Sequence, residues 1–303
     1  MMKILIAYDG SSCSDAALDD LARAGLPPQV EALVVSVAEV WLPPPSLIPD
    51  ESRDETDDFI DSIVESHHKK GDLIRKEAER LVEEARQRLN VNFPEWNVST
   101  KATFGSPSFE ILSAARASVP DLIVVGSQGQ SALGRFVLGS VSQKVLTEAD
   151  CSVRVARGRN EVDPTPVRLI IGFDGTAGAM TAVRSVAARN WPADTAVRLV
   201  AATDSLHLPL PDAETDEKWI SHFTSDAEQV LRGSIADVSM AIAGGNPNRV
   251  LIEEADQWHA DCIFVGANAI GGRVERFLLG STSAAVAARA NCSVEVVRER
   301  PAA

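Results

Sequence analysis

The sequence has no long apolar run and only four cysteines. No stretch approaches the ~20 apolar residues that a membrane-spanning helix needs. The N-terminus lacks the basic segment, apolar core and cleavage site of a secretory signal peptide. Cys13, Cys151, Cys262 and Cys292 include no C-x-x-C pair. We therefore expect a cytoplasmic protein with packed thiols rather than disulfides, and no membrane partner.

An excess of positive charge is also missing. The net charge is −14, and residues 1–160 carry 17 basic against 24 acidic side chains, while the remainder carries 12 against 19. A surface of this sign repels nucleic acids and anionic membranes, so neither is expected as the main partner.

Several chemical signatures are absent as well. There is no Walker A loop, no Gly-x-Gly-x-x-Gly fingerprint, and no evident general base, activated nucleophile or phosphate-facing lysine, so no catalytic residue is predicted. The adjacent His67 and His68 point in different directions on a helix, and no protein-made metal site is predicted either.

What the sequence does contain is an internal repeat, which is the feature to seek first. Five segments of the first half return in the same order in the second half. The matched pairs are 3–11 with 168–176, 104–107 with 244–247, 121–126 with 261–266, 135–140 with 276–281, and 151–155 with 292–296. The repeat predicts two copies of one domain, over residues 1–157 and 167–303, joined by a polar linker over 158–166.

Each copy alternates short apolar segments with helical patterns. The predicted strands are 3–9, 31–37, 98–104, 121–125 and 152–155 in the first copy, and 168–173, 196–202, 237–243, 261–265 and 293–297 in the second. Strands that alternate with right-handed helical crossovers give a parallel sheet covered on both faces. We expect two α/β domains, each an open five-stranded parallel sheet with the order 3-2-1-4-5.

The first copy carries an insertion after its second strand. Asp9 and Gly126 are 117 residues apart, whereas their counterparts Asp174 and Gly266 are 92 apart. The extra residues include a proline-rich stretch from Trp41 and an acidic stretch that runs to Asp61, before a clear helical pattern over 72–89. A flap, a dimer contact and a solvated excursion are all open readings of residues 41–70.

Glycines follow the fourth strand of the first copy. Gly126 and Gly129 come directly after the strand, and after nine intervening residues Gly139-Ser140 open a helical segment. Glycines permit close approach of the backbone, and a helix N-terminus offers unpaired N–H groups, so this layout can hold phosphate. Asp9, at the end of the first strand, lies where such sheets bind ligands. Turn glycines and an Asx-turn at Asp9 are the structural alternatives.

With these residues in place, the chain resembles the universal stress protein family, as a tandem two-domain member. The ATP-binding branch of that family is marked by Gly-x2-Gly-x9-Gly-Ser/Thr after the fourth strand, which Gly126, Gly129, Gly139 and Ser140 match. The resemblance covers nearly all of both halves. It implies a Rossmann-like fold of the adenine nucleotide alpha hydrolase type in each copy.

The resemblance also implies a binding site. Ala7, Tyr8 and Asp9 would surround the adenine, and Val37 would meet it through backbone groups. The ribose and phosphates would contact Gly126, Gln128, Gly129, Gly139, Ser140, Val141 and Ser142. The expected ligand is ATP or another adenine nucleotide, with Mg²⁺ or Mn²⁺ held by the phosphates.

The second copy departs from this pattern. Ala269 replaces the second glycine, and the spacing from Gly266 to Gly280 is one residue longer. Its candidate residues are Asp174, Ala202, Gly266, Gly280, Ser281, Thr282 and Ser283. We expect this copy to keep the fold and to have lost part of the site.

The functional expectation is an ATP-binding, stress-response regulatory protein that binds mainly through the first copy. The alternatives are a slow ATP hydrolase and a dimerisation scaffold that binds no nucleotide. By the same resemblance, the two copies should pair with each other through their fifth strands, and two chains are expected to form a homodimer.

Overall fold

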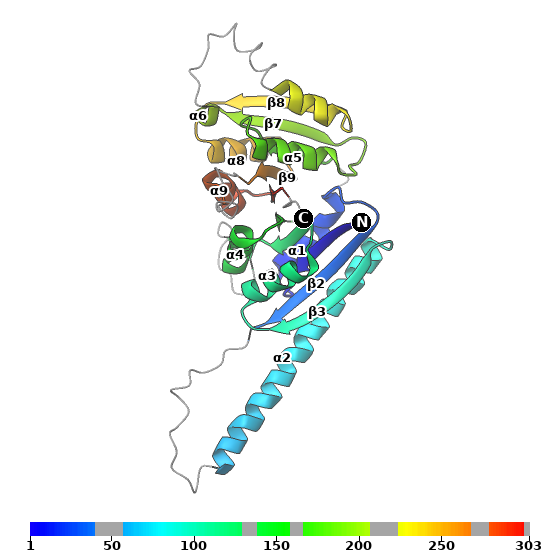
Figure 1. The fold of residues 1–303 in the computed structure, drawn as a ribbon, viewed down its shortest axis with the longest axis vertical. Coiled ribbons are helices and arrows are strands. Elements are labelled where there is room, and N and C mark those ends of the chain that lie inside the picture. The colour runs from blue at the N-terminus through cyan, green and yellow to red at the C-terminus, as the bar shows by residue number, and fades with distance from the viewer. Residues whose placement is uncertain (40–56, 129–137, 158–165, 207–223, 268–278, 300–303) are drawn as a thin grey trace.

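The structure is a computed structural model that describes residues 1–39, 57–128, 138–157, 166–206, 224–267 and 279–299 (Figure 1). For residues 57–72 and 205–206 it describes the backbone alone.

Ten strands form one continuous sheet, in the order β3-β2-β1-β4-β5-β10-β9-β6-β7-β8. We call β1–β5 with their helices the first module and β6–β10 with theirs the second. The strands are β1 Met2–Ala7, β2 Val30–Ala38, β3 Asn97–Phe104, β4 Leu122–Gly126, β5 Ser152–Ala156, β6 Arg168–Gly172, β7 Ala196–Ala202, β8 Asp237–Ala243, β9 Cys262–Gly266 and β10 Ser293–Val297.

Within each module the strand order is 3-2-1-4-5 and every pairing is parallel, which confirms the predicted fold. Each of the central strands β1, β4, β6 and β9 has at least three consecutive buried apolar residues, as expected for strands covered on both faces.

Helices cover both faces of the sheet. They are α1 Ser12–Asp20, the short 3₁₀ turn η1 Leu21–Arg23, α2 Asp57–Asn92, α3 Pro107–Ser118, α4 Ser140–Glu148, α5 Ala177–Ala187, α6 Thr203–Leu206, α8 Pro247–Trp258 and α9 Ser281–Arg289, with a further helix over residues 224–232. The Ser11 hydroxyl caps α1 by accepting from the Ser14 amide, and Thr176 caps α5 in the same way.

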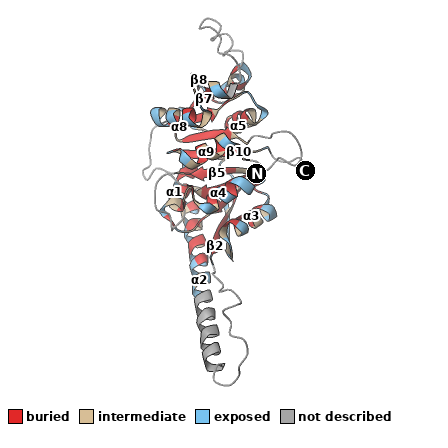
Figure 2. Ribbon diagram, turned by 90° about the vertical axis from the view of Figure 1, so that its left-hand side faces the viewer, coloured by how far each residue is buried: buried red, intermediate tan, exposed pale blue. Residues whose placement is uncertain are grey.

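The apolar core has three parts. Figure 2 shows the buried residues in red along the strands and helices. One cluster lies under α1 and α2 of the first module, and a second lies under α5 and the 224–232 helix of the second. The third, under α3, α4, α8 and α9, is shared by both modules. The modules are therefore joined by continuous packing on one face as well as by the sheet.

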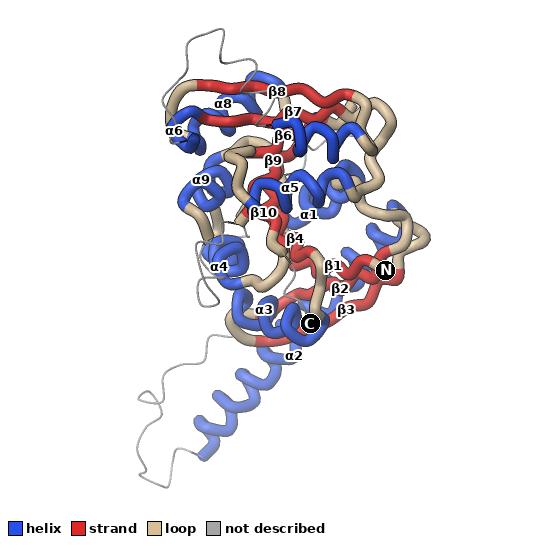
Figure 3. The backbone as a smooth tube through the Cα atoms, turned by 45° about the horizontal axis from the view of Figure 1, so that its top comes forward, coloured by secondary structure: helices blue, strands red, loops and turns tan. Residues whose placement is uncertain are grey.

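The junction is the pairing of β5 with β10, the single antiparallel pairing of the described sheet. It confirms the prediction that the fifth strands of the two copies pair. Figures 1 and 3 show α4 and α9 side by side across this junction.

The helix α2 begins at Asp57, well before the predicted start at residue 72. Its first turns therefore occupy part of the insertion, where the sequence is acidic and weakly periodic. The rest of the insertion, residues 40–56, lies outside the described residues, so its role stays open.

Candidate functional site

The strand order places a crevice at the carboxyl end of each module's first strand. β1 pairs with β2 on one side and β4 on the other, and the chain leaves β1 and β4 toward opposite faces of the sheet. Such a reversal point is where open α/β sheets bind ligands. In the second module β6 has the same position between β7 and β9.

An aspartate stands at each crevice, just after the central strand. Oδ1 of Asp9 accepts a 3.0 Å hydrogen bond from the Ser11 amide, and Oδ1 of Asp174 accepts from the Thr176 amide at 3.0 Å and its hydroxyl at 2.6 Å. The Asx-turn that was the structural alternative at Asp9 is therefore present, and Asp174 forms the same turn. Gly10 and Gly175 complete the turns with φ values of +73° and +76°.

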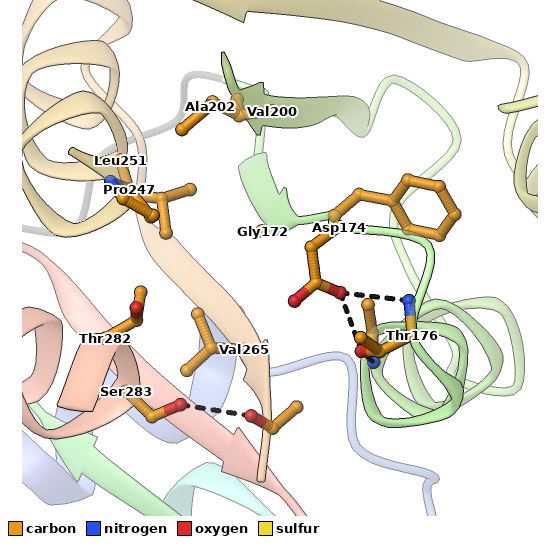
Figure 4. A pocket seen from close by; sticks show the side chains of 13 residues that line it. Gly172, Asp174, Thr176, Val200, Ala202, Pro247, Leu251, Val265, Thr282 and Ser283 are labelled. Atoms are coloured by element: carbon orange, nitrogen blue, oxygen red, sulfur yellow. Dashed lines mark hydrogen bonds between the residues drawn. The ribbon is translucent and has the colours of Figure 1, made fainter. Parts of the chain in front are cut away.

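The second module has a defined pocket at this point, with about 70 Å³ of space for water (Figure 4). Its lining residues are Gly172, Phe173, Asp174, Thr176, Ala179, Val200, Ala202, Pro247, Leu251, Val265, Gly266, Thr282 and Ser283. In Figure 4 the Asp174 oxygen that is not bonded to Thr176 points away from the turn, toward the pocket. The pocket thus has apolar walls, a carboxylate at one side and hydroxyl groups at the other.

The pocket brings together five of the seven residues predicted in the second module, namely Asp174, Ala202, Gly266, Thr282 and Ser283. Gly280 and Ser281 are not among its lining residues, although they begin the adjacent helix α9. The assignment of these residues to a ligand stays a prediction.

Sequence reasoning missed the apolar wall of this pocket. Pro247 and Leu251 come from α8, and Val200 and Val265 from the neighbouring strands. The repeat contained the signal, because Pro247 and Pro107 begin equivalent helices, but it gave no indication that this helix faces the crevice.

The helices that follow the crevices begin in the same way. Gly139 and Gly280 stand at the N-caps of α4 and α9, and no side chain caps either helix among the described residues. Gly139 donates its own N–H to the Ser127 carbonyl at 2.9 Å. Within the described residues, the first-turn N–H groups of both helices thus lack the usual side-chain cap, and such groups are the donors that a phosphate requires.

The serines of the first turn differ in what they can do. Ser142 donates to the Gly126 carbonyl at 2.6 Å, and its counterpart Ser283 donates to Gly266 at 3.0 Å. Both serines are buried, whereas Ser140 and Ser281 are exposed. The buried pair ties each helix to the end of the preceding strand, and the exposed pair is better placed for a ligand.

Gly126 and Gly266 are required by packing. A Cβ atom on Gly126 would lie 3.0 Å from the backbone of Cys13, and one on Gly266 would overlap the backbone of Gly178. The first turn of α5 is too close to Gly266 for a side chain, and the first turn of α1 would have to shift by a few tenths of an ångström to admit one at Gly126. The glycine after the strand therefore has a structural role in both modules, in addition to any contact with ligand.

The residues of the first module that are predicted to contact adenine lie on opposite faces of the sheet. Ala7 and Val37 are half-buried beside the α3/α4 face, while Tyr8 packs in the α1/α2 cluster and donates to Asp15 at 2.7 Å. Tyr8 is 3% exposed, so its ring cannot face a ligand on the opposite side, and only its backbone could line the site. Burial and the hydrogen bond to Asp15 raise the pKa of the Tyr8 phenol.

Of the remaining candidates, Gln128 is half-buried after β4, and Val141 packs against the shared core. Gly129 lies outside the described residues.

Metal and thiol chemistry receive little support from the described residues. These contain no cluster of three histidine, cysteine, aspartate or glutamate side chains that could hold a metal ion, and the side chains of His67 and His68 lie outside them. All four cysteines are free, and burial raises the pKa of Cys151 to about 11 and of Cys292 to about 12. No helix among the described residues is long and apolar enough to cross a membrane.

Comparison with known proteins gives consistent matches. The profile described as the Universal stress protein family matches residues 1–157 and 167–298. A universal stress protein of Mycobacterium bovis is 27% identical over 307 residues, covering 98% of this chain and 97% of that protein. One of Bacillus subtilis is 32% identical over 163 residues, covering 51% of this chain and 98% of its own length.

A solved structure has the same architecture over the full length. The crystal structure of a universal stress protein from Archaeoglobus fulgidus matches with a TM-score of 0.66 and 21% identity, covering 99% of this chain and 98% of the other. At this level of identity the likeness establishes the fold and carries no information about ligands.

Proposed function

This chain belongs to the universal stress protein family, and from that membership we propose that it binds an adenine nucleotide, chiefly ATP, in its first module. The proposed site residues are those that the resemblance implies, with Tyr8, Gly126 and Ser142 contributing backbone only. The proposal includes a cytoplasmic location, which the four free thiols support.

The observation that carries the proposal is the arrangement shared by the two modules, whose described example is the pocket of the second module. It lies at the reversal point of the sheet, has apolar walls from β7, β9 and α8, and has Asp174 on one side and the start of α9 on the other. An apolar slot with few polar groups suits a base, and the helix start suits an anionic tail. The first module has the same strands, turn and helix start, together with the intact glycine spacing.

A cation is compatible with this arrangement through the phosphates alone. Because the described residues hold no cluster of three metal-binding side chains, we propose that Mg²⁺ or Mn²⁺ would be bound by phosphate oxygens and water. Nothing near the described site supplies an evident general base, so ATP turnover well above ~1 s⁻¹ would favour the hydrolase alternative.

The scaffold alternative has one specific observation in its favour for the second module. β9 and β10 continue the sheet of the first module, and the shared core cluster spans both. The second module can therefore serve to complete the first even without ligand. We also expect two chains to associate, which sedimentation of the purified protein would test.

The test uses matched isosteric variants, Asp9→Asn and Asp174→Asn. Asparagine keeps the acceptor that Ser11 or Thr176 needs for the Asx-turn, so the fold is retained. It removes the carboxylate charge and replaces one acceptor by a donor, which cannot accept from an adenine amino group. Loss of a hydrogen bond to a charged group should weaken binding by roughly 10- to 100-fold.

Calorimetry with ATP, together with mass spectrometry of molecules released from the purified chain, provides the measurements. We expect Asp9→Asn to reduce affinity and Asp174→Asn to leave the first site unchanged. Absence of adenine-nucleotide binding by the wild-type chain, at concentrations up to a few millimolar, would refute the proposal. Wild-type binding that only Asp174→Asn weakens would move the site to the second module.

A further inference from the structure

The β5–β10 pairing has a local two-fold symmetry with a residue pair on its axis. Arg154 faces Glu295 in the register, with Val155 facing Val294 and Val153 facing Val296. In the repeat, Cys151 matches Cys292, so Arg154 and Glu295 are equivalent positions. Among the pairs of this register, these two residues are the ones that face their own counterpart, and they differ in sign of charge.

This axial pair is completely buried. Arg154 and Glu295 are both 0% exposed, and Arg154 Nη1 lies 3.3 Å from Glu295 Oε2. Each has a second partner from its own module. Arg154 Nε donates to Asp20 Oδ2 at 2.5 Å, and Glu295 is paired with Arg189. Each module thus contributes one positive and one negative side chain at the axis, and the four side chains together have no net charge.

A pair of first modules or a pair of second modules would also have a net charge of zero among the buried groups at the axis. Pairing of unlike modules and pairing of like modules differ in the contact that is made across the axis. If two first modules paired in this register, Arg154 would face a second Arg154. Its Nη1 would lose Glu295 and also the Cys262 sulfur, 3.3 Å away, whose counterpart in the first module is Leu122.

Such an arginine would be left with buried donors and no acceptors. Nη2 of Arg154 already lacks a hydrogen-bond partner among the described atoms, so Nη1 would become the second unpaired group. Two facing second modules would bring two Glu295 carboxylates together in the same buried position. Buried charges that lose their partner are strongly destabilising.

A second contact discriminates by size. Gly25, in the loop after η1, has a φ of +62°, and a Cβ there would lie 2.6 Å from the ring of Trp191 in the second module. The counterpart of Gly25 is Asn190, and that of Trp191 is Leu26. Two second modules would therefore place each tryptophan against a residue that carries a side chain.

From these contacts we infer that buried charge and side-chain size at the β5 and β10 edges favour pairing between the first and the second module. The same features disfavour pairing between two first modules or between two second modules. The partner that fits either edge is the other module of this protein. Arg154 and Glu295 determine this specificity by charge, and Gly25 and Trp191 determine it by size.

These two contacts matter because much of the rest of the junction is the same for both modules. The valines that flank the axis are the same in both strands, and Arg157 and Arg298 make equivalent contacts. During synthesis β5 is complete about 140 residues before β10. At ~5–20 residues per second, an open edge is available for roughly 7–28 s to the first modules of neighbouring chains.

The test uses two full-length charge-reversal variants. Arg154→Glu leaves three carboxylates, the introduced one with those of Asp20 and Glu295, against Arg189, and Glu295→Arg leaves three guanidiniums against Asp20. In neither variant can the two modules of one chain pair with a net charge of zero at the axis. When the two are mixed, the first module of each fits the second module of the other, and both junctions become neutral. Pairing of the two first modules, or of the two second modules, would leave a net charge at the axis. Pairing of the first module of one chain with the second module of the other is therefore favoured.

Hydrogen exchange of the 152–156 and 293–297 amides reports directly on the junction. We expect exchange to be roughly 100-fold faster or more in each variant alone. Mixing should restore protection and give a two-chain assembly of about 65 kDa, twice the 32.4 kDa of one chain. If either variant does not fold alone, the co-expressed pair should still yield that assembly.

The control is Arg23→Glu. Arg23 joins Asp261 across the modules at 2.8 Å, away from the axis, so the same reversal there should not rescue Glu295→Arg on mixing. Native protection in both single variants would overturn the inference. So would a mixed or co-expressed pair that shows neither protected edge strands nor the two-chain assembly.

Discussion

Arg157 and Arg298 occupy equivalent positions directly after β5 and β10, and each binds the end of a helix in the other module. Arg157 Nη2 donates to the Ala287 carbonyl of α9 at 2.6 Å, and Arg298 Nη2 donates to the Leu146 carbonyl of α4 at 2.5 Å. A cation at a helix C-terminus is favourable because the last carbonyls are unpaired. The two helices whose first turns form the candidate anion sites are thus held at their other ends by the opposite module.

We predict that Arg157→Met and Arg298→Met each lower the free energy of unfolding by about 1.5–3 kcal/mol, the range for hydrogen bonds of charged groups. Burial lowers the pKa of both guanidiniums, and methionine fills most of the space without charge. Denaturant titration measures the effect. Arg184→Met, on the exposed face of α5, is the control and should change stability by less than about 0.5 kcal/mol.

The sheet topology was predictable from the sequence because it depends on local features. Apolar segments followed by Asp-Gly or a glycine loop recur in both halves, and alternation with helices leaves few arrangements of a parallel sheet. The sequence could not predict the environment of Arg154. The alternating residues 152–155 are typical of an edge strand used for pairing, but this pattern does not indicate that Arg154 is fully buried. Its acceptors come from α1 and from a strand about 140 residues away.

The candidate site was predictable to a similar extent. The crevice position follows from strand order, and Asp174, Gly266 and Ser283 do line a pocket. The direction of Tyr8 was not predictable, since an aromatic residue at a strand end can face either side. The apolar wall from α8 was missed because a degraded glycine motif carries no information about neighbouring helices.

A second prediction concerns the glycines after β4 and β9. Gly266→Ala should destabilise the protein by about 1–3 kcal/mol, the usual cost of overpacking, because the new methyl group overlaps the Gly178 backbone. Gly126→Ala should cost less, because its nearest neighbour, the Cys13 backbone, is 3.0 Å away. Thermal or denaturant unfolding of the two variants provides the comparison. Equal losses would show that α1 and α5 adjust equally.

A third prediction separates the two serines of the α4 first turn. Ser142→Ala removes the hydrogen bond to the Gly126 carbonyl and should cost about 1 kcal/mol of stability with little change in nucleotide affinity. Ser140→Ala should leave stability unchanged and weaken ATP binding by roughly tenfold, since its exposed hydroxyl is available to phosphate. Unfolding and calorimetry on both variants give the four values. Loss of affinity in Ser142→Ala alone would reverse the assignment.

The last prediction uses the fact that Tyr8 is the only tyrosine in the chain. Its phenol is buried and donates to Asp15, which also pairs with Arg88. These surroundings raise its pKa above the unfolded value of about 10. The neutral phenol is thus favoured by folding, so its contribution is fully present below pH ~10 and is lost as the pH rises toward the folded pKa.

Ultraviolet titration of tyrosinate should therefore show no ionisation of the native protein near pH 10, and a normal titration after unfolding. Tyr8→Phe should lower stability at neutral pH by about 1 kcal/mol, for the lost hydrogen bond. The variant should also show a shallower loss of stability above pH ~10 than the wild type. The buried thiols of Cys151 and Cys292 add an alkaline dependence of the same sign, which is common to both proteins and cancels in the difference. A native titration near pH 10, or parallel alkaline slopes for the two proteins, would contradict the burial of Tyr8 against α1 and α2.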